Sequence, residues 1–528
     1  MDTDVIVVGA GPTGLMLACE LALAGVRTRI VERRDAPQLD SRALTLHPRS
    51  VELMDQRGLA DRFLALGRTV PGWHFADLDT RLDFGALDSR HGYTLFLAQA
   101  RTEALLEERA RELGVEIHRG RETTGLRQDP DGVEVDVRGP GGARTVRASY
   151  VVGCDGGRSI VRQEAGIDFP GTDETLTGIL GDFAVADLES LGRARAEGVL
   201  AVPLEGGLTR FVLIDPERMR TPAAEPVTVE EFRESLIRIC GSDCGIDRPR
   251  WLSRFGNATR LAERYRTGRV LLAGDAAHIH FPAAGQGLNT GLQDAMNLGW
   301  KLAAEIHGWA PPGLLDTYHG ERHPVGVAVT ENTEVQTLLA ELPLVPSYQR
   351  PASALRRLLD ELLGIEEVNR RLAGLVSALG VGYPATGPGA DPLVGTRMPD
   401  IPLSIAGSPA SRVYELLHEG RFVLLNLVQE RGFDAGEGWA DRVTAVTSAT
   451  SVTADGARHA RLDGVAEVLV RPDGHIAWAT RTAGSAARRT ERYEALAAWA
   501  GRPQDGLPGG VRPACPARTG ASGSTARC

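Results

Sequence analysis

The sequence predicts an α/β protein in which a doubly wound parallel sheet is interrupted by an antiparallel-sheet domain and followed by a further α/β domain. The first observation is a buried strand, Asp4–Val8, that leads through a glycine-rich turn into a helix and then into a second strand, Arg27–Val31. The second is that buried strands of the same kind return at residues 150–154 and 269–273. The third is that residues 168–266 carry the short strands and hairpin turn of an antiparallel sheet.

The turn after the first strand has the GxGxxG spacing of a Rossmann-like dinucleotide-binding domain. Gly9 permits the turn, Gly11 lets a pyrophosphate approach the backbone, and Gly14 lets the helix pack close to the sheet. The N-terminus of that helix supplies free amides and the positive end of a dipole. Glu32 ends the second strand, where a carboxylate suits a free ribose 2′-hydroxyl and repels a 2′-phosphate. The alternative is a merely tight turn between strand and helix.

Two later strands also end in acidic residues. The strand Tyr150–Cys154 runs into Asp155, and the strand Arg269–Ala273 runs into Gly274 and Asp275. An acid that follows a parallel strand, as Asp155 does, belongs at the same crevice as the acid after the second strand.

A second glycine-rich loop, Pro282–Asn289, leads into a helix predicted over Thr290–Ile306. A second helix N-terminus is explained if the ligand has another electron-rich part, because reduced flavin carries negative charge that amides and a helix dipole stabilise. The alternative is an ordinary glycine loop that begins a helix. His278 and His280 stand nearby, but only Asp275 accompanies them, so packed or polar loop histidines are favoured over a metal site.

The segments between these motifs leave two questions open. Helices are predicted at Pro48–Arg57, Arg101–Leu113 and Val229–Cys240. Arg42 is either surface charge or a group that closes over cofactor phosphates. Residues 70–97 indicate strands of a second sheet, and their aromatic side chains form either ordinary core or the lining of an aromatic substrate pocket. These aromatic residues are Trp73, Phe75, Phe84, Tyr93 and Phe96.

The composition excludes several classes of protein. With 42 % hydrophobic and 24 % charged residues and no long apolar run, the chain is expected to be globular and without a membrane span. The net charge of -10 argues against a nucleic-acid partner. The first strand begins at once, so no signal peptide is expected. The six cysteines form no CxxC pair, so neither disulfides nor zinc are expected, and a reducing cytoplasm fits.

The last part of the chain predicts a helical segment, a linker and a separate domain. Residues 343–372 are mostly helical, and residues 384–392 are rich in Pro and Gly. Strands at Arg421–Leu427 and near residues 467–471, with a last helix at Arg489–Ala500, indicate an α/β domain. The tail after residue 500 has the Pro-, Gly- and Ser-rich composition of a disordered segment.

Taken together, the three strand-end motifs resemble those of single-component FAD aromatic hydroxylases related to para-hydroxybenzoate hydroxylase. The likeness is closer to the polyketide hydroxylases of angucycline and anthracycline pathways. Four stretches carry that closer resemblance, which covers the chain from about residue 3 to residue 500: Gly256–Arg260, His278–Pro282, Gly285–Thr290 and Asn297–Leu302.

Position by position, the resemblance implies a set of FAD contacts. The glycine turn with Thr13 would hold the pyrophosphate, Glu32 the adenosine ribose and Asp275 the ribityl or ribose region. Leu288 and Asn289 would offer backbone amides to the isoalloxazine, and Asp155 belongs to a motif linked with both FAD and NAD(P)H. The whole implied set is Gly9, Gly11, Pro12, Thr13, Gly14, Glu32, Arg33, Arg42, Gln99, Asp155, Asp275, Pro282, Gly285, Gly287, Leu288 and Asn289.

The resemblance also gives an expected domain division and identifies the last domain as thioredoxin-like. That domain lacks CxxC, so it is expected to be a packing or dimerisation module, which leaves a homodimer open, and not a redox centre. The expected units are an FAD-binding domain (1–70, 98–176 and 267–342), a substrate-binding sheet domain (71–97 and 177–266), a helical segment with linker (343–392), the thioredoxin-like domain (393–500) and a disordered tail (501–528).

In the family that the chain resembles, NAD(P)H reduces non-covalent FAD, dioxygen adds at C4a, and the hydroperoxide delivers one oxygen to an electron-rich ring. The cofactor does this chemistry, so no catalytic side chain can be named from the sequence. The resemblance implies hydroxylation of a polycyclic aromatic polyketide, in antibiotic biosynthesis. The alternatives are Baeyer–Villiger oxidation, epoxidation or antibiotic inactivation, a flavin-dependent dehydrogenase or reductase, and a non-catalytic nucleotide-binding module.

Overall fold

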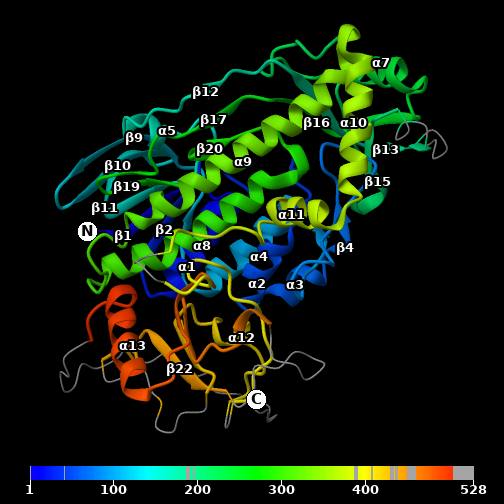
Figure 1. The fold of residues 1–528 in the computed structure, drawn as a ribbon. Coiled ribbons are helices and arrows are strands. Elements are labelled where there is room, and N and C mark those ends of the chain that lie inside the picture. The colour runs from blue at the N-terminus through cyan, green and yellow to red at the C-terminus, as the bar shows by residue number, and fades with distance from the viewer. Residues whose placement is uncertain are drawn as a thin grey trace, which may run out of the picture.

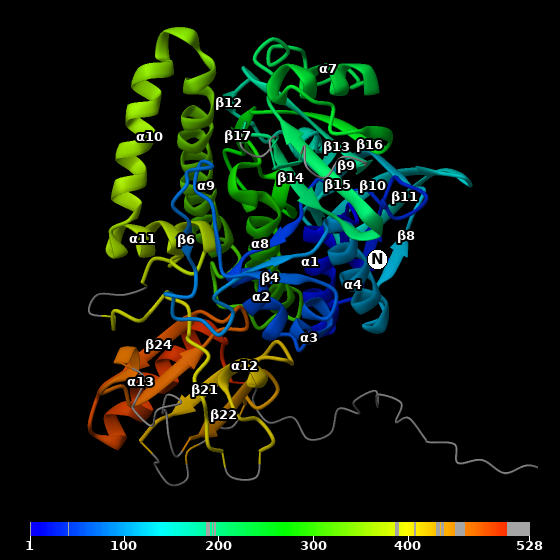
Figure 2. The same ribbon diagram turned by 90° about the vertical axis from the view of Figure 1, so that its right-hand side faces the viewer.

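The structure is a computed structural model that describes residues 2–40, 42–185, 191–192, 194, 197–385, 390–405, 408–428, 433, 438–448 and 460–503. Figures 1 and 2 show three parts: a central α/β body, an antiparallel sheet with α7 at one end, and a C-terminal domain at the other. Residues 504–528, most of the predicted disordered tail, lie outside the described residues. Among the described residues, no helix has the length and apolarity needed to cross a membrane.

The central sheet has the strand order β18-β19-β11-β1-β2-β8. β1 pairs in parallel with β2 on one side and with β11 on the other, and β11 pairs in parallel with β19. The strands that the sequence predicted as buried and parallel are therefore confirmed. The members are β1 (Thr3–Val8), β2 (Thr28–Val31), β8 (Glu116–His118), β11 (Gly142–Gly153), β18 (Arg266–Thr267) and β19 (Val270–Leu272), with β9 (Glu122–Asp129) and β10 (Gly132–Gly139) extending β11 antiparallel.

Helix α1 (Pro12–Leu23) is the central helix of this body and packs against both α8 (Gln286–Ile306) and α4 (Gln99–Glu112). Residues 14–21 of α1 are all buried, because the helix lies between the sheet and these two neighbours. The other helices here are α2 (Pro48–Asp55), α3 (Ala60–Leu64) and α5 (Ile160–Glu164). The predicted helices at Pro48–Arg57 and Arg101–Leu113 are confirmed with small shifts of their ends.

The predicted antiparallel sheet is confirmed, with the order β14-β15-β13-β16. Its strands are β13 (Thr177–Val185), β14 (Leu200–Pro203), β15 (Leu208–Leu213) and β16 (Ile246–Gly256). Helix α7 (Val229–Cys240) has the predicted bounds, and its Phe232 ring lies 4.8 Å from that of Phe183. This aromatic contact fixes the helix against one face of the sheet.

The remaining strands before the C-terminal domain form three small sheets. The predicted strands in residues 70–97 pair with one another and with β3, and they do not join the four-stranded sheet. The strand sets are β3 (Thr45–Leu46), β7 (Thr94–Phe96) and β4 (Arg68–Val70); β5 (Gly72–Trp73) and β6 (Leu82–Asp83); and β12 (Gly171–Thr172), β17 (Thr259–Leu261) and β20 (His278–Ile279).

The helical segment predicted after residue 342 is confirmed as α10 (Gln349–Leu363) and α11 (Glu366–Ser377). The long helix α9 (Thr317–Glu341) leads into α10 through short turns at the end of the molecule away from the C-terminal domain (Figures 1 and 2). α10 and α11 share a core with Phe75 and Phe84, so these two aromatic residues are ordinary core.

The C-terminal domain has a four-stranded sheet of order β22-β21-β23-β24. β21 (Phe422–Asn426) is parallel to β22 (Val443–Thr447), whereas β23 (Glu467–Val470) and β24 (Ile476–Thr480) form an antiparallel hairpin beside it. The helices are α12 (Val413–Leu416) and α13 (Ser485–Trp499). The first tail residues pack on this domain, since Trp439 Nε1 donates to the Gly501 carbonyl at 2.8 Å.

Candidate functional site

The glycine turn is closely packed at two positions and open at the third. Gly9 has φ 106°, and a Cβ placed there or at Gly14 would overlap a carbonyl oxygen, of Cys154 or of Gly9 itself. A Cβ on Gly11 would meet no protein atom within 4 Å. The turn is therefore held by its neighbours while its Gly11 face is open to a ligand, which is the arrangement that a pyrophosphate requires.

Thr13 brings the first glycine motif together with the other two. A Cβ on Gly274 would lie 2.6 Å from Thr13 Oγ1, and a Cβ on Gly291 of α8 would also overlap that oxygen. Both glycines are thus needed for the close approach of α1, the Gly274–Asp275 turn and α8. Segments more than 200 residues apart in the chain therefore meet at this hydroxyl, with α1 on one side and the Gly274–Asp275 turn and α8 on the other.

Glu32 bridges the end of β2 and the glycine turn. Its two carboxylate oxygens accept hydrogen bonds from the backbone amides of Ala10 at 2.8 Å and Arg34 at 2.9 Å. The side chain is 8 % exposed, whereas its neighbour Arg33 is exposed. Each carboxylate oxygen keeps a further acceptor site, so these contacts leave room for a ribose hydroxyl.

Asp155 faces the short helix α5. One carboxylate oxygen accepts from the Ile160 amide at 2.8 Å, and burial raises the pKa of the group. The other oxygen is buried and has no hydrogen-bond partner among the described residues. A buried acceptor without a partner is costly unless something donates to it, so Asp155 retains capacity for a ligand contact.

Asp275 and Arg42 lie close to each other at the junction with the antiparallel sheet. The Asp275 side chain reaches solvent. The protein around it reduces its hydration and so raises its pKa, whereas the nearby charges of His278 and Arg42 lower it. The Arg42 guanidinium donates to the Ser253 hydroxyl on β16 at 3.1 Å. Arg42 is therefore not an isolated surface charge.

Gln99, at the first turn of α4, donates its backbone amide to the Ala43 carbonyl at 3.0 Å.

The second glycine loop ends in an uncapped helix N-terminus. Gly285 has φ 70° at the N-cap of α8, no side chain caps it, and the first turn holds no acidic residue. Because α8 begins at Gln286, four residues before the predicted start, the amides without a partner inside the helix include those of Gln286, Gly287 and Leu288. The amide of Asn289 is the first that can bond back to Gly285 within the helix. Pro282, the first residue of the loop, is exposed.

Asn289 contributes its side chain, which clamps the loop to β3. Its Oδ1 accepts from the His47 amide at 2.8 Å, and its Nδ2 donates to the carbonyls of Thr45 at 3.2 Å and Gly285 at 2.8 Å. The loop is thus fixed before any ligand binds.

One residue beside this loop, His47, was not singled out from the sequence. His47 is buried, its Nε2 lies 2.7 Å from the Ala284 carbonyl, and burial lowers its pKa to about 4. Trp73 Nε1 donates to the same carbonyl at 3.1 Å, and the Phe96 ring is 5.2 Å from that of Trp73. The aromatic segment supplied a signal for Trp73 and Phe96, but no local pattern marked His47.

The two loop histidines are packed, as the sequence favoured. His278 is buried with its Nε2 2.7 Å from Asp294 Oδ2, and His280 Nδ1 lies 2.8 Å from the Phe281 carbonyl. Within the described ranges no group of three or more metal-ligating side chains occurs. Asp294, on α8, was not singled out from the sequence, although an acid within an apolar helix stripe is a signal for it.

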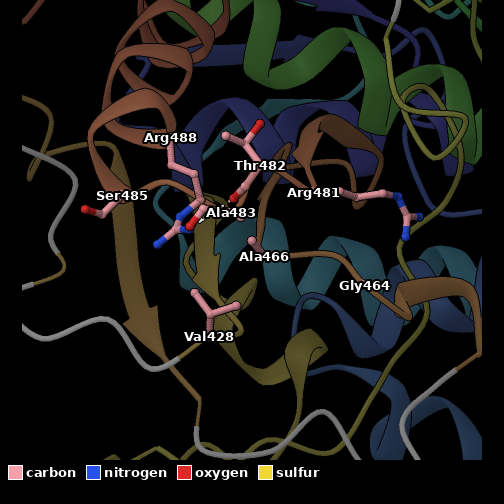
Figure 3. Close-up of a pocket in the computed structure, with 8 residues that line it drawn as sticks. All are labelled: Val428, Gly464, Ala466, Arg481, Thr482, Ala483, Ser485 and Arg488. Carbon is pink, nitrogen blue, oxygen red and sulfur yellow. Dashed lines mark hydrogen bonds between the residues drawn. The ribbon is translucent and has the colours of Figure 1, made fainter.

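The recess shown in Figure 3 is remote from these motifs, in the C-terminal domain. It has a volume of about 420 Å³ and lies between the start of α13 and the ends of β21 and β23. Its two arginines are already engaged: Arg481 pairs with Asp391 at 2.7 Å, and Arg488 donates to the Thr482 and Ala483 carbonyls. These charges hold the domain together, so the recess offers no site comparable to the glycine motifs.

Comparisons with known proteins agree with this geometry. The model of the FAD binding domain family matches residues 2–333, and that of the aromatic-ring hydroxylase C-terminal domain matches residues 391–503. A 12-dehydrotetracycline 5-monooxygenase/anhydrotetracycline 6-monooxygenase of Streptomyces rimosus is 46 % identical over 95 % of this chain and 100 % of its own. A rifampicin monooxygenase of Streptomyces venezuelae is 48 % identical over 90 % of this chain and 95 % of its own. The structure of an anhydrotetracycline hydroxylase from Streptomyces rimosus superposes with TM-score 0.86 at 45 % identity, covering 96 % of this chain and 100 % of that one.

Fold and glycine motifs together define a flavin-nucleotide-binding α/β protein with an added C-terminal domain. The chain belongs to the FAD-binding aromatic-ring hydroxylases. It is an FAD-dependent monooxygenase of aromatic compounds.

Proposed function

We propose that this monooxygenase uses NAD(P)H and dioxygen to hydroxylate a polycyclic aromatic polyketide, in the biosynthesis of an antibiotic. The observation that carries the proposal is the convergence of the open Gly11 turn, the uncapped start of α8 and the Trp73–Phe96 pair around one region. Relatives named for tetracycline intermediates support the substrate class.

FAD fits the residues of this region. Gly9–Gly14 with Pro12 and Thr13 would hold the pyrophosphate, and Glu32 with neighbouring Arg33 the adenosine ribose. Asp275 would bind the ribityl region, and Leu288 would donate its amide to the flavin ring. Further contacts would come from Arg42, Gln99, Asp155, Pro282, Gly285, Gly287 and Asn289. When bound, FAD supplies the electron transfer and the activation of dioxygen.

The protein's own part is to bind, orient and shield the cofactor. The free amides at the start of α8 would stabilise negative charge on the ring that they face. Trp73 and Phe96 are partly exposed beside the loop that leads into α8, so they are suited to contact an aromatic substrate. Only one complete dinucleotide fingerprint is present in the sequence, so NAD(P)H would bind transiently elsewhere.

An aromatic antibiotic is the alternative substrate. The identity of 48 % to a rifampicin monooxygenase favours it, and oxidation would then inactivate the antibiotic. Baeyer–Villiger oxidation and epoxidation use the same cofactor, so the product distinguishes them from hydroxylation.

The C-terminal domain fits a thioredoxin-like fold used for packing. A parallel pair, β21 and β22, followed by an antiparallel hairpin and α13 supports this fold. The sequence has no CxxC, so a redox role is not proposed.

The test is a screen of aromatic polyketides and aromatic antibiotics for substrate-triggered NAD(P)H oxidation, with mass analysis of products formed under ¹⁸O₂. We expect one labelled oxygen in the product, on a ring carbon. A product whose new oxygen carries no label, and so comes from water, would overturn the proposal. Turnover of an electron acceptor without oxygen incorporation would favour a dehydrogenase or reductase.

A further inference from the structure

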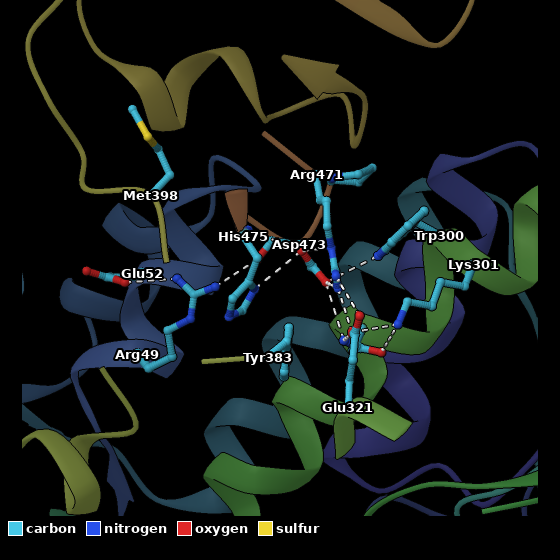
Figure 4. A network of polar contacts seen from close by, with 12 residues as sticks. Arg49, Glu52, Trp300, Lys301, Glu321, Tyr383, Met398, Arg471, Asp473 and His475 are labelled. Atoms are coloured by element: carbon cyan, nitrogen blue, oxygen red, sulfur yellow. Dashed lines mark hydrogen bonds and ion pairs between the residues drawn. The ribbon is translucent and has the colours of Figure 1, made fainter. Parts of the chain in front are cut away.

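A cluster of buried charges joins the C-terminal domain to the FAD-binding body (Figure 4). The turn between β23 and β24 contributes Arg471 and Asp473, which are 1 % and 2 % exposed. Arg471 forms a bidentate pair with Glu321 of α9, at 2.7 and 2.8 Å. Asp473 accepts from the Trp300 indole of α8 at 3.3 Å. Arg471 and Asp473 also pair with each other, so the polar groups of this turn are satisfied partly within the turn and partly by helices α8 and α9.

The same turn leads to Tyr383, which lies between the two parts. The Tyr383 ring packs against the His475 ring with centroids 4.3 Å apart and planes tilted by 34°. The Arg471 guanidinium lies 5.1 Å from the centre of the Tyr383 ring. Tyr383 is also tied to the domain by its backbone, which donates to the Gly395 carbonyl at 2.9 Å. The Tyr383 hydroxyl in turn accepts from Arg322 of α9 at 3.3 Å. The phenol thus connects the turn to a fully buried guanidinium.

Arg322 orients Asp294 on α8. Its Nε donates to Asp294 Oδ1 at 2.7 Å, and its Nη2 donates to the Thr290 carbonyl at 3.2 Å. Although burial acts to raise it, the charges of Arg322 and His278 hold the pKa of Asp294 below its usual value. Asp294 is therefore a carboxylate fixed in the ionised state by its neighbours.

Asp294 in turn holds the third glycine motif. Its Oδ2 accepts from the Gly274 amide at 3.1 Å and from His278 Nε2 at 2.7 Å. These two groups flank Asp275 in the chain, so Asp294 sets the turn that presents Asp275. Gly274 is also the residue that packs on the Thr13 hydroxyl. The orientation of Asp294 thus affects the place where the motifs meet.

We propose that the C-terminal domain is part of the cofactor site, since its Arg471–His475 turn acts through Tyr383 and Arg322 on Asp294, which positions the Gly274–Asp275 turn. Asp294 and Tyr383 are positioning residues that do not touch the cofactor. The inference rests on the FAD site proposed above. Every member of the chain of contacts is buried, so water cannot replace a lost partner, and a change at one end shifts the others.

The test is Tyr383→Phe, which removes the hydroxyl that Arg322 bonds to and keeps the ring that packs against His475. We expect FAD to bind the variant apo-protein about 2- to 30-fold more weakly, the range of coupling found along such networks. FAD affinity is measured by quenching of flavin fluorescence, and the visible spectrum of the bound flavin is expected to change. The thermal midpoint of the apo-protein is recorded in parallel.

Tyr414→Phe is the matched control. The Tyr414 hydroxyl is also buried, accepts from buried Arg397 at 3.2 Å and donates to the Met398 carbonyl at 3.0 Å. It bonds to neither Arg322 nor Asp294, and it reaches the Asp473 carbonyl only indirectly, through Arg397, Glu52 and Arg49. We expect a similar loss of apo-protein stability and an unchanged FAD affinity. Equal weakening by both variants, or no weakening by Tyr383→Phe, would overturn the inference.

Asp294→Asn tests the last step of the chain of contacts. The amide has the size of the carboxylate but cannot pair with both Arg322 and His278, so FAD affinity should fall further than in Tyr383→Phe. If this variant does not fold, the comparison of Tyr383→Phe with Tyr414→Phe still tests the inference. Failure of the FAD site itself is distinguishable, because then Gly11→Val would keep its FAD.

Discussion

At the scale of single residues, the glycine turn has one position at which a side chain affects folding and another at which it affects binding. Gly14 has no room for a Cβ because the Gly9 carbonyl occupies that space, whereas Gly11 has open space and an N-cap φ of -76° that any residue adopts. A side chain at Gly14 therefore disturbs the protein itself. A side chain at Gly11 disturbs only what binds there.

Gly11→Val is predicted to give a folded protein without FAD. The valine would occupy the approach of the pyrophosphate, so FAD should bind at least about tenfold more weakly, a loss of ~1.4 kcal/mol. Flavin absorbance of the purified protein and circular dichroism measure the two properties separately. Gly14→Val is the contrasting variant, expected to lose both flavin and stability. Full flavin content in Gly11→Val would place the site elsewhere.

Glu32→Ala is predicted to weaken FAD binding by about 1–3 kcal/mol, the cost of a lost hydrogen bond to a charged group. Stability should also fall, because the Ala10 and Arg34 amides lose their acceptor. Titration calorimetry of the apo-protein with FAD measures the first effect. Asp4→Ala is the control. Asp4 accepts from the Arg27 amide at the N-terminal end of β1 and β2, the end opposite to Glu32. An FAD affinity equal in the two variants would contradict the role of Glu32.

The sequence predicted those residues whose role depends on local backbone geometry. Gly9, Gly14 and Glu32 belong to a strand–turn–helix unit in which spacing alone sets their positions. His47 was missed because its partner Asn289 lies 242 residues away. Asp294 was missed for the same reason, since Gly274, His278 and Arg322 are brought to it only by the fold.

At the scale of elements, α8 connects the Pro282–Asn289 loop to the interface with the C-terminal domain. Its first turn presents free amides, and its later residues Asp294 and Trp300 meet the contacts that lead to the C-terminal domain. The helix is buried over most of its length. One continuous element thus contributes residues both to the loop and to the interface with the C-terminal domain.

Asn289→Ala is predicted to lower FAD affinity by loosening the start of α8 from β3. Loss of its three hydrogen bonds to backbone should cost about 1–3 kcal/mol of stability. Asn369→Ala is the control, because Asn369 makes the same kind of clamp, to the Asp83 amide and the Arg81 and Leu363 carbonyls. We expect similar losses in thermal midpoint but weaker FAD binding only in Asn289→Ala. Unchanged FAD affinity in both would contradict the role of the clamp.

Element prediction succeeded where hydrophobic periodicity was strong. Helix α7 was predicted to the residue, because its apolar stripe and the Thr228 cap mark both the face and the start. The start of α8 was placed four residues late, because Gly285 at positive φ allows a glycine-rich segment to form the first turn. The strands in residues 70–97 pair in small separate sheets, an arrangement that residue alternation does not specify.

At the scale of the whole molecule, charge pairs hold the C-terminal domain to the FAD-binding body. Arg57 of the body pairs with Glu20 and donates to the Leu417 and Pro472 carbonyls of the domain. Arg412 of the domain pairs with Asp55 of α2 at 2.8 Å. The family resemblance implied a packing or dimerisation module but not these pairs, because charge patterns do not reveal partners separated by hundreds of residues.

Glu321 makes this interface sensitive to acid. Although burial acts to raise its pKa, Arg471 and Lys301 lower it to about 2. A carboxyl group whose pKa is lower in the folded than in the unfolded state binds its proton less readily when folded. It stabilises the fold above its unfolded pKa, and this contribution is lost as pH falls through about 4 toward 2.

We therefore predict that Glu321→Gln unfolds more easily than the unmodified protein at pH 6 and that this difference shrinks as the pH is lowered. The pH-dependent part of the difference should be on the order of 3 kcal/mol in full, of which about 2 kcal/mol is lost between pH 6 and pH 3. Urea unfolding of both proteins at pH values from 6 to 3 measures it as the gap between two free energies of unfolding. Glu366→Gln is the control, since Glu366 pairs with Arg370 in an exposed contact and should show little difference at any pH. A gap between Glu321→Gln and the unmodified protein that stays constant from pH 6 to 3 would mean that the ionised form of Glu321 does not stabilise the interface, and its contacts with Arg471 and Lys301 would then act only through packing.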